Sequence, residues 1–271
     1  MNLQTNYPAM PNFKSGLTWK IIQDIKQTNV AKTQADFAKI GLDADFRGKK
    51  SVCANFVYAA NILYDICEKY KLPFDFVPYS ISVYKNKELI KPGSYFAFTI
   101  NDTGKVLNGK PSFIGGSIFI NDFGSGIYEN DFYTNQDYKK GRRSSSHFLS
   151  NTLHEWFHAI HMDLMYKKYG YEGKCPILRD AYQKSEKDDG LQRYENMDKT
   201  NFSSLPDDFV KYIGEYAVKP NSMLEMFAEL MTKITTLSLD KKLNVIKNPL
   251  DNLPNNLPKE VKNILEDLLD I

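Results

Sequence analysis

Three of the four histidines in the 271-residue chain lie within eight positions, in the stretch HEWFHAIH. His154 and His158 are four residues apart and Glu155 follows the first of them, which matches the H-E-x-x-H pattern of helical zinc sites. On a helix both imidazoles would share one face and could reach one metal ion. Glu155 would then be placed to take a proton from an attacking water molecule. The pattern predicts one zinc ion per chain; the alternative is a helix with partly exposed histidines.

A catalytic zinc site usually has three protein ligands, so a third must come from elsewhere. His161 shares the helix face with His154, but it lies about 10 Å further along the axis, and one ion cannot easily hold both. We interpret His161 as a residue that supports the ligands or forms the wall of the site. His147 precedes the motif by two turns and is interpreted as a solvated or helix-capping residue.

Two glutamates further along the chain are better candidates for the third ligand. Glu225 and Glu229 are four residues apart in a predicted helix, so both face the same way. The pair Ser222 and Glu225 also fits a helix capping box, in which the glutamate would bind backbone amides instead of a metal. Taken alone, the residues leave both interpretations open.

The HExxH motif and the glutamate pair together resemble a known family. HEWFHAIH, then a Tyr-Ala pair, a short spacer and EMFAE, is similar to the lethal-factor-type zinc metallopeptidases, a gluzincin group that includes the Pro-Pro endopeptidases and toxin domains of phage and effector proteins. The resemblance covers roughly residues 112–240. It implies a zincin-like fold with zinc bound by His154, His158 and Glu225, and it implies that Glu229 orients one of these ligands.

The same resemblance assigns a role to Tyr216, whose hydroxyl would point at the oxyanion formed from the substrate carbonyl. The chain departs from the family in two places. His161 stands where members often have aspartate, and the spacer between Tyr216 and Glu225 is slightly longer than in the family.

Hydrophobic periodicity predicts the elements that position these residues. Apolar residues at helical spacing predict helices over 17–40, 51–71, 145–169, 177–187, 223–237 and 259–269. Runs of β-branched and aromatic residues between turn signals predict strands over 74–84, 94–101 and 112–122.

The order of these elements predicts an α+β, zincin-like fold. N-terminal helices and a small mixed sheet would precede the HExxH helix and a C-terminal helical part. We expect a single metallopeptidase domain over 1–271, with an irregular leader at 1–16 and sub-parts at 17–144 and 145–271. In the HExxH helix, we expect the apolar side chains to bury the helix and leave the site face toward a cleft: Leu153, Trp156, Phe157 and Ile160.

An extended peptide substrate would lie beside the metal by adding a strand to an exposed sheet edge. SFIGGSIFIND, over 112–122, is the edge-strand candidate, because Gly115 and Gly116 allow a bulge or a close approach of the substrate backbone. The same glycines also fit a bent strand of the core.

Composition restricts the partners of the chain. The chain has 35 Lys and Arg against 33 Asp and Glu, and this balance favours neither nucleic acid nor an anionic membrane as a partner. No run of apolar residues is long enough to span a bilayer, and the first residues lack a Sec signal pattern. We expect a cytoplasmic protein by default, with secretion without a signal or packaging in a virion also compatible. The expected partner is a protein or peptide substrate, and the sequence does not indicate the oligomeric state.

The cysteines are odd in number and widely spaced, which does not favour a disulfide framework: Cys53, Cys67 and Cys175.

Together these features predict a zinc-dependent endopeptidase in which Glu155 is the general base and Tyr216 donates to the oxyanion. One alternative is another HExxH enzyme such as a deformylase, which needs a cysteine ligand that neither Cys53 nor Cys67 is placed to supply. A second is a catalytically silent, toxin-like or virion protein with a zincin fold. Glu155 argues against the second, because binding zinc does not require this glutamate.

Overall fold

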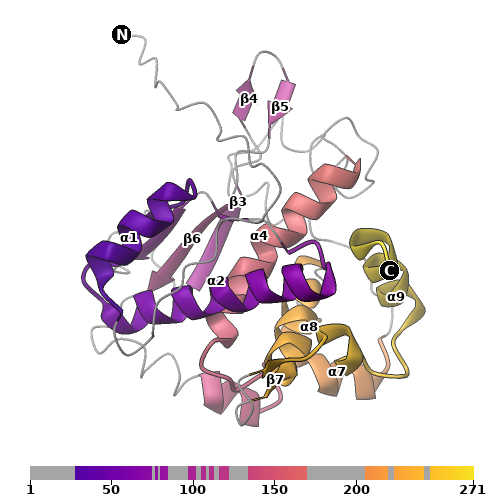
Figure 1. Cartoon of the computed structure of the whole chain (residues 1–271). Coiled ribbons are helices and arrows are strands. Elements are labelled where there is room, and N and C mark those ends of the chain that lie inside the picture. The colour runs from indigo at the N-terminus through magenta and orange to yellow at the C-terminus, as the bar shows by residue number, and fades with distance from the viewer. Residues whose placement is uncertain are drawn as a thin grey trace.

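The computed structural model describes residues 28–74, 77–78, 80–84, 97–101, 105–107, 110–112, 116–121, 134–169, 205–218, 223–240 and 245–271. The chain has a mixed α and β structure in which helix predominates (Figure 1). The helices are α1 (Val30–Lys39), α2 (Lys50–Tyr70), α4 (Ser150–Tyr169), α7 (Asp207–Ile213), α8 (Met223–Ser238) and α9 (Lys259–Leu269), with 3-10 turns η3 (Glu215–Ala217) and η4 (Pro249–Asn252). The strands are β1 (Asp43–Asp45), β2 (Ser80–Tyr84), β3 (Ala97–Asn101), β4 (Lys105–Leu107), β5 (Lys110–Ser112), β6 (Gly116–Asn121), β7 (Leu239–Asp240) and β8 (Val245–Ile246).

The main sheet has four strands in the order β1-β2-β6-β3. β1, β2 and β6 are parallel, whereas β3 is antiparallel to β6. The sheet is therefore mixed, as predicted, but the prediction that 112–122 supplies the edge strand is wrong. β6 lies between β2 and β3, and its Ile118 and Ile120 are buried, as expected for a strand with neighbours on both sides. Gly116 pairs in register with Asn101, and Gly115 lies outside the described residues.

Several predicted bounds differ from the structure. Among the described residues of the strand predicted over 74–84, only those of β2 form a strand. The helix predicted over 17–40 is described from Val30 onward. The strand β1, the β4–β5 pair, α7 and a helical turn at 134–139 were not predicted, because their segments are too short to show a clear period. The leader at 1–16, the helix at 177–187 and Cys175 lie outside the described residues.

The helix predicted to begin at 145 begins five residues later, at Ser150. The hydroxyl of Ser145 accepts from the amide of His147, and Nδ1 of His147 accepts from the amide of Leu149. The His147 carbonyl accepts in turn from the amide of Ser150. These local bonds satisfy backbone amides outside a helical ladder, so 145–149 forms a turn that leads into α4. Of the two roles expected for His147, the capping role matches its contacts.

α2 is close to its predicted bounds. It ends where Lys71 adopts a left-handed conformation with φ of 58°, and its amide bonds to the carbonyl of Cys67. Cys53 and Cys67 both lie on this helix, the first fully buried and the second partly. Among the described residues, no helix has the length and apolar character needed to cross a bilayer.

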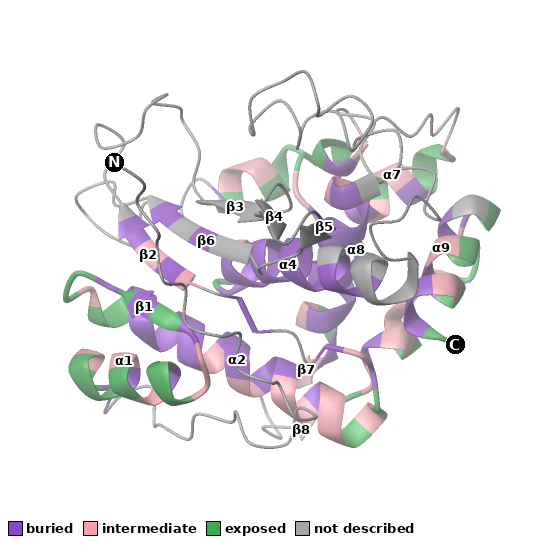
Figure 2. Cartoon of the chain, turned by 90° about the horizontal axis from the view of Figure 1, so that it is seen from above, coloured by how far each residue is buried: buried purple, intermediate pink, exposed green. Residues whose placement is uncertain are grey.

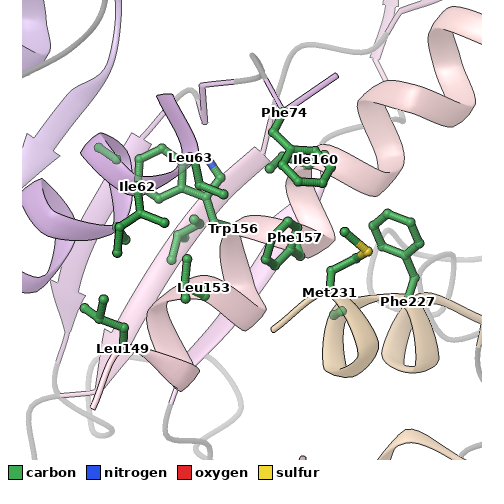
Figure 3. Packing of buried hydrophobic residues seen from close by; sticks show 14 of the residues in the cluster. Ile62, Leu63, Phe74, Leu149, Leu153, Trp156, Phe157, Ile160, Phe227 and Met231 are labelled. Carbon is green, nitrogen blue, oxygen red and sulfur yellow. The ribbon is translucent and has the colours of Figure 1, made fainter. Parts of the chain in front are cut away.

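The core is built around α4, which contacts β3, β6, α2, α8 and α9. Figure 3 shows Trp156 directed toward α2 and Phe157 directed toward Met231 of α8. The Trp156 ring lies 6.2 Å from Phe56, and the Phe157 ring meets Phe74 edge-on at 5.3 Å. The four apolar side chains predicted to bury the helix are all fully buried: Leu153, Trp156, Phe157 and Ile160.

Burial of α4 extends further than predicted. Every residue from 152 to 161 is buried, so polar positions are covered as well as apolar ones, and α4 is largely purple in Figure 2. The helix therefore runs through the centre of the molecule, with the sheet on one side and α8 on another. Its histidines and Glu155 must find compensating groups inside the protein, because water is largely excluded.

This packing predicts a difference between two leucines. Leu63 of α2 is fully buried in the core, whereas Leu237 of α8 is 51% exposed. We expect Leu63→Ala to lower the free energy of unfolding by about 2–5 kcal/mol, because it removes buried methyl groups and leaves a cavity. Leu237→Ala should change it by no more than about 0.5 kcal/mol. Urea unfolding of both variants tests this, and equal losses would contradict the packing described here.

Candidate metal centre

Three ligand atoms from α4 and α8 converge in the interior. The Nε2 atoms of His154 and His158, one helical turn apart, are separated by 3.0 Å. Glu225, in the first turn of α8, places Oε2 3.1 Å from Nε2 of His154 and Oε1 3.6 Å from Nε2 of His158. One ligand atom from each of the three residues lies within 4.8 Å of the others.

The spacing of these atoms suits a zinc ion. Bonds of about 2.0–2.2 Å in a tetrahedron set the ligand atoms roughly 3.3 Å apart. The observed separations of 3.0, 3.1 and 3.6 Å surround this value. His154 and His158 are each only 3% exposed, which differs from the alternative of a helix with partly exposed histidines. The residues present therefore fit a small divalent metal held by two nitrogens and one oxygen.

Glu229 lies on the other side of His154. Its Oε1 is 3.1 Å from Nδ1 of His154, so the two glutamates of α8 face opposite edges of one imidazole. Glu229 also accepts a hydrogen bond of 2.7 Å from Arg143 and one of 3.0 Å from the amide of Ser144. A carboxylate held in this way fixes the ring of His154 and sets which nitrogen faces Glu225.

The electrostatics of the site favour a cation between the carboxylates. Burial alone would lower the pKa of His154, but Glu229 and Glu225 outweigh burial and raise the pKa to about 10. Burial alone would raise the pKa of Glu225, but the imidazoles of His158 and His154 hold it well below its usual range. A metal ion among the ligand atoms would take the place of the proton on Nε2 of His154 and would meet Glu225. Nδ1 would keep the proton that faces Glu229.

Glu155 and Tyr216 both lie near His154. Glu155 is buried on α4 next to His154, and the ring of Tyr216, carried by η3, is centred 6.2 Å from the ring of His154. Tyr216 is 38% exposed as a residue. Burial is the largest influence raising the pKa of Tyr216; Glu225, Glu155 and Glu229 raise it too, while Arg143 opposes them. The phenol therefore stays protonated at neutral pH and can act as a hydrogen-bond donor.

His161 lies outside the group of ligand atoms. It is fully buried and stacks on Phe227 of α8, with ring centroids 4.3 Å apart. Neither ring nitrogen has a hydrogen-bond partner among the described residues. Burial, with a smaller contribution from His158, lowers the pKa of His161 to about 3, so the ring is neutral. The structure places His161 in the wall between α4 and α8, one of the two positions expected for it.

Sequence reasoning missed three contributors to the site. Arg143 and Ser144 bind Glu229 from the segment before α4, and Lys233 donates to the carbonyl of Ser144 at 2.8 Å. The only sequence signal was a pair of arginines in a polar stretch. No periodicity relates Arg143 to Glu229, 86 residues later. Ser222, the partner of Glu225 in the predicted capping box, lies outside the described residues.

The geometry predicts different roles for the two glutamates of α8. We expect Glu225→Ala to weaken zinc binding steeply, because only two histidine nitrogens remain. Glu229→Ala should cost less, about 10- to 100-fold, because it removes a partner of His154 and no ligand. Glu266→Ala, at a half-exposed position on α9, is the control and should leave affinity unchanged.

Zinc titration against a competing chelator measures all three variants. A reversed order would move the ligand to Glu229. Unchanged affinity in Glu225→Ala, with a loss of stability near about 1 kcal/mol, would indicate that this residue only caps the helix.

Comparisons of the chain with protein-family models, with curated proteins and with solved structures gave no match. Function is therefore inferred from the residues of the site and from their geometry.

Proposed function

We propose that the protein is a zinc-dependent endopeptidase of the gluzincin type with a zincin-like fold. The observation that carries the proposal is the convergence of His154, His158 and Glu225, with Glu155 next to the first histidine. Two nitrogens and one oxygen leave a fourth position open, which is typical of catalytic zinc and not of structural zinc. The retained glutamate favours hydrolysis over simple binding, because holding the metal does not need it.

The proposed chemistry divides among the protein groups around the metal. When bound, zinc would polarise the scissile carbonyl and make the attacking water more acidic. Glu155 accepts the proton of that water and later delivers it to the leaving amine. Tyr216 donates a hydrogen bond to the developing oxyanion, because its phenol keeps its proton. Glu229 holds the ring of His154 in one orientation throughout.

The proposed substrate is an extended segment of a protein or peptide. β3 is the strand of the main sheet that α4 contacts most closely, and within the described residues it pairs only with β6. A peptide that added to the other edge of β3 would run beside the helix that carries the histidines. The proposed edge strand is therefore 97–101 and not 112–122.

The alternatives differ in what they require of the site. A deformylase-like enzyme needs a cysteine ligand, but Cys53 and Cys67 lie on α2 and neither belongs to the group of ligand atoms. A catalytically silent binding protein needs the metal but not Glu155. Metal content and peptide cleavage, measured on different variants, separate these possibilities.

The first experiment concerns the metal. We expect purified protein to carry about one zinc per chain, and we expect His154→Ala or His158→Ala to lose it, because each removes one of three ligands. His147→Ala is a matched control outside the ligand group and should keep the metal. Elemental analysis of wild type, of these three variants and of the protein that carries both His154→Ala and His158→Ala measures the content. Metal that persists at full content in the doubly substituted protein would rule out this site.

The second experiment concerns the general base. Glu155→Gln keeps the shape of the side chain but cannot accept a proton, so we expect peptide cleavage to fall about 100- to 10,000-fold with zinc content unchanged. Cleavage of a peptide library by wild type and variant measures the effect. Equal cleavage by the two proteins would show that the chemistry does not depend on this base. A wild type that binds zinc but cleaves no peptide would favour the silent binding protein.

A further inference from the structure

The segment before α4 is docked against η3 by its backbone. The amide of Glu215 donates to the carbonyl of Gly141 at 2.9 Å, and the amide of Tyr216 donates to the carbonyl of Arg142 at 2.8 Å. Gly214 has φ of 87°, and a Cβ at this position would lie only 2.7 Å from the oxygen of Arg142. Only glycine permits both the conformation and the close approach. Residues 141–144, called here the arginine segment, are thus held beside the turn that carries Tyr216.

The arginine segment is also attached to α8. The amide of Ser144 donates to Oε2 of Glu229 at 3.0 Å, and Lys233 donates to the carbonyl of Ser144 at 2.8 Å. The segment therefore lies between η3 and α8, which carry two different parts of the proposed site. A side chain from this segment can contact both.

Arg143 makes these two contacts with one guanidinium group. Its Nη1 donates to Oε1 of Glu229 at 2.7 Å, and its Cζ lies 4.5 Å from the centre of the Tyr216 ring. The same Oε1 of Glu229 lies 3.1 Å from Nδ1 of His154. A continuous set of contacts therefore runs from Tyr216 through Arg143 and Glu229 to His154.

The contact between Arg143 and Glu229 favours the charged form of both side chains. Burial alone would raise the pKa of Glu229, but Arg143 and His154 outweigh it and lower the pKa to about 2. Burial alone would lower the pKa of Arg143, but Glu229 and Tyr216 raise it above its ordinary value. The Arg143 side chain is only 15% exposed, so solvent does little to screen it. A planar guanidinium can bond a carboxylate at its edge while its face covers an aromatic ring, which an ammonium cannot do.

We propose that Arg143 is a positioning residue that aligns the two halves of the site, holding the Glu229 carboxylate on His154 and the ring of Tyr216 beside the metal. The inference rests on the proposed metal centre, and it adds a residue to which neither the HExxH pattern nor the EMFAE stretch points. Arg143 is not one of the three proposed ligands. It acts through Glu229 on metal affinity and through Tyr216 on turnover.

Three variants test the role. Arg143→Ala removes both contacts, and Arg143→Lys keeps the positive charge but loses the planar face. Arg142→Ala is the matched control, because Arg142 is the neighbouring arginine, has a side chain 58% exposed, and pairs only loosely with Asp137 at 3.5 Å. Each variant is assayed for thermal unfolding, for zinc affinity, for the visible absorption of the cobalt-substituted protein, and for kcat and KM on a peptide that wild type cleaves.

We expect Arg143→Ala to lower zinc affinity about tenfold and to shift the cobalt spectrum, since His154 loses part of its support. Arg143→Lys should retain more of the zinc affinity but should lose kcat with little change in KM, because the ring of Tyr216 is no longer covered. Arg142→Ala should match wild type. In a Glu229→Gln background, the effect of Arg143→Ala on zinc affinity should shrink, and in a Tyr216→Phe background its effect on kcat should shrink.

The outcomes separate this inference from the proposed function. Folded Arg143→Ala and Arg143→Lys proteins with wild-type zinc affinity and cobalt spectrum would overturn the role of Arg143 alone. A loss of thermal stability with those two properties unchanged would do the same, because it indicates an ordinary structural ion pair. A wild type that binds no metal would overturn the proposed function, and the inference with it. A wild type that binds zinc but cleaves nothing leaves the affinity and spectral measurements as the test.

Discussion

Charged groups that are buried together in the interface between α4 and α8 are the constraint on which the rest of the structure depends. Glu155, Glu229 and the two histidines are nearly inaccessible, and Glu225 is only 15% exposed. Carboxylates in such a place must be paired, because an uncompensated buried charge costs far more than a packing defect. Arg143 pairs with Glu229, His154 lies between Glu229 and Glu225, and a divalent cation among the ligand atoms would pair with Glu225.

The spacing of α8 turns this constraint into a precise arrangement. Glu225 and Glu229 are one helical turn apart, and each lies 3.1 Å from a different nitrogen of His154. One carboxylate therefore faces the ligand side of the ring and the other faces its back. The packing of Phe157 and Met231 between the same two helices sets the distance at which this can happen (Figure 3). The apolar contacts and the polar contacts of the interface depend on each other for this reason.

Local patterns could predict the parts of the site that lie on one helix, because a helix fixes the relative directions of residues four apart. They placed His154 and His158 on one face, and they indicated Glu225 and Glu229 on another helix. They could not place β6 in the middle of the sheet, because the neighbours of a strand are set by chain topology and the strand itself is equally apolar in either position. The start of α4 was missed because local hydrogen bonds to Ser145 and His147, and not hydrophobic periodicity, shape the turn before it. Arg143 was missed because only the folded chain brings it to Glu229.

The two halves of the proposed site are thus positioned by different kinds of structure. The ligand atoms come from regular helices, so their separations follow from the packing of α4 against α8. Tyr216 comes from a 3-10 turn, and its position follows from two backbone hydrogen bonds and from the positive φ of Gly214. The turn η3 also packs against α7 and α8, and its Ala217 is fully buried, so packing brings the two halves together. The guanidinium of Arg143 touches both, and so the alignment of the tyrosine with the metal ligands depends on a side chain that belongs to neither.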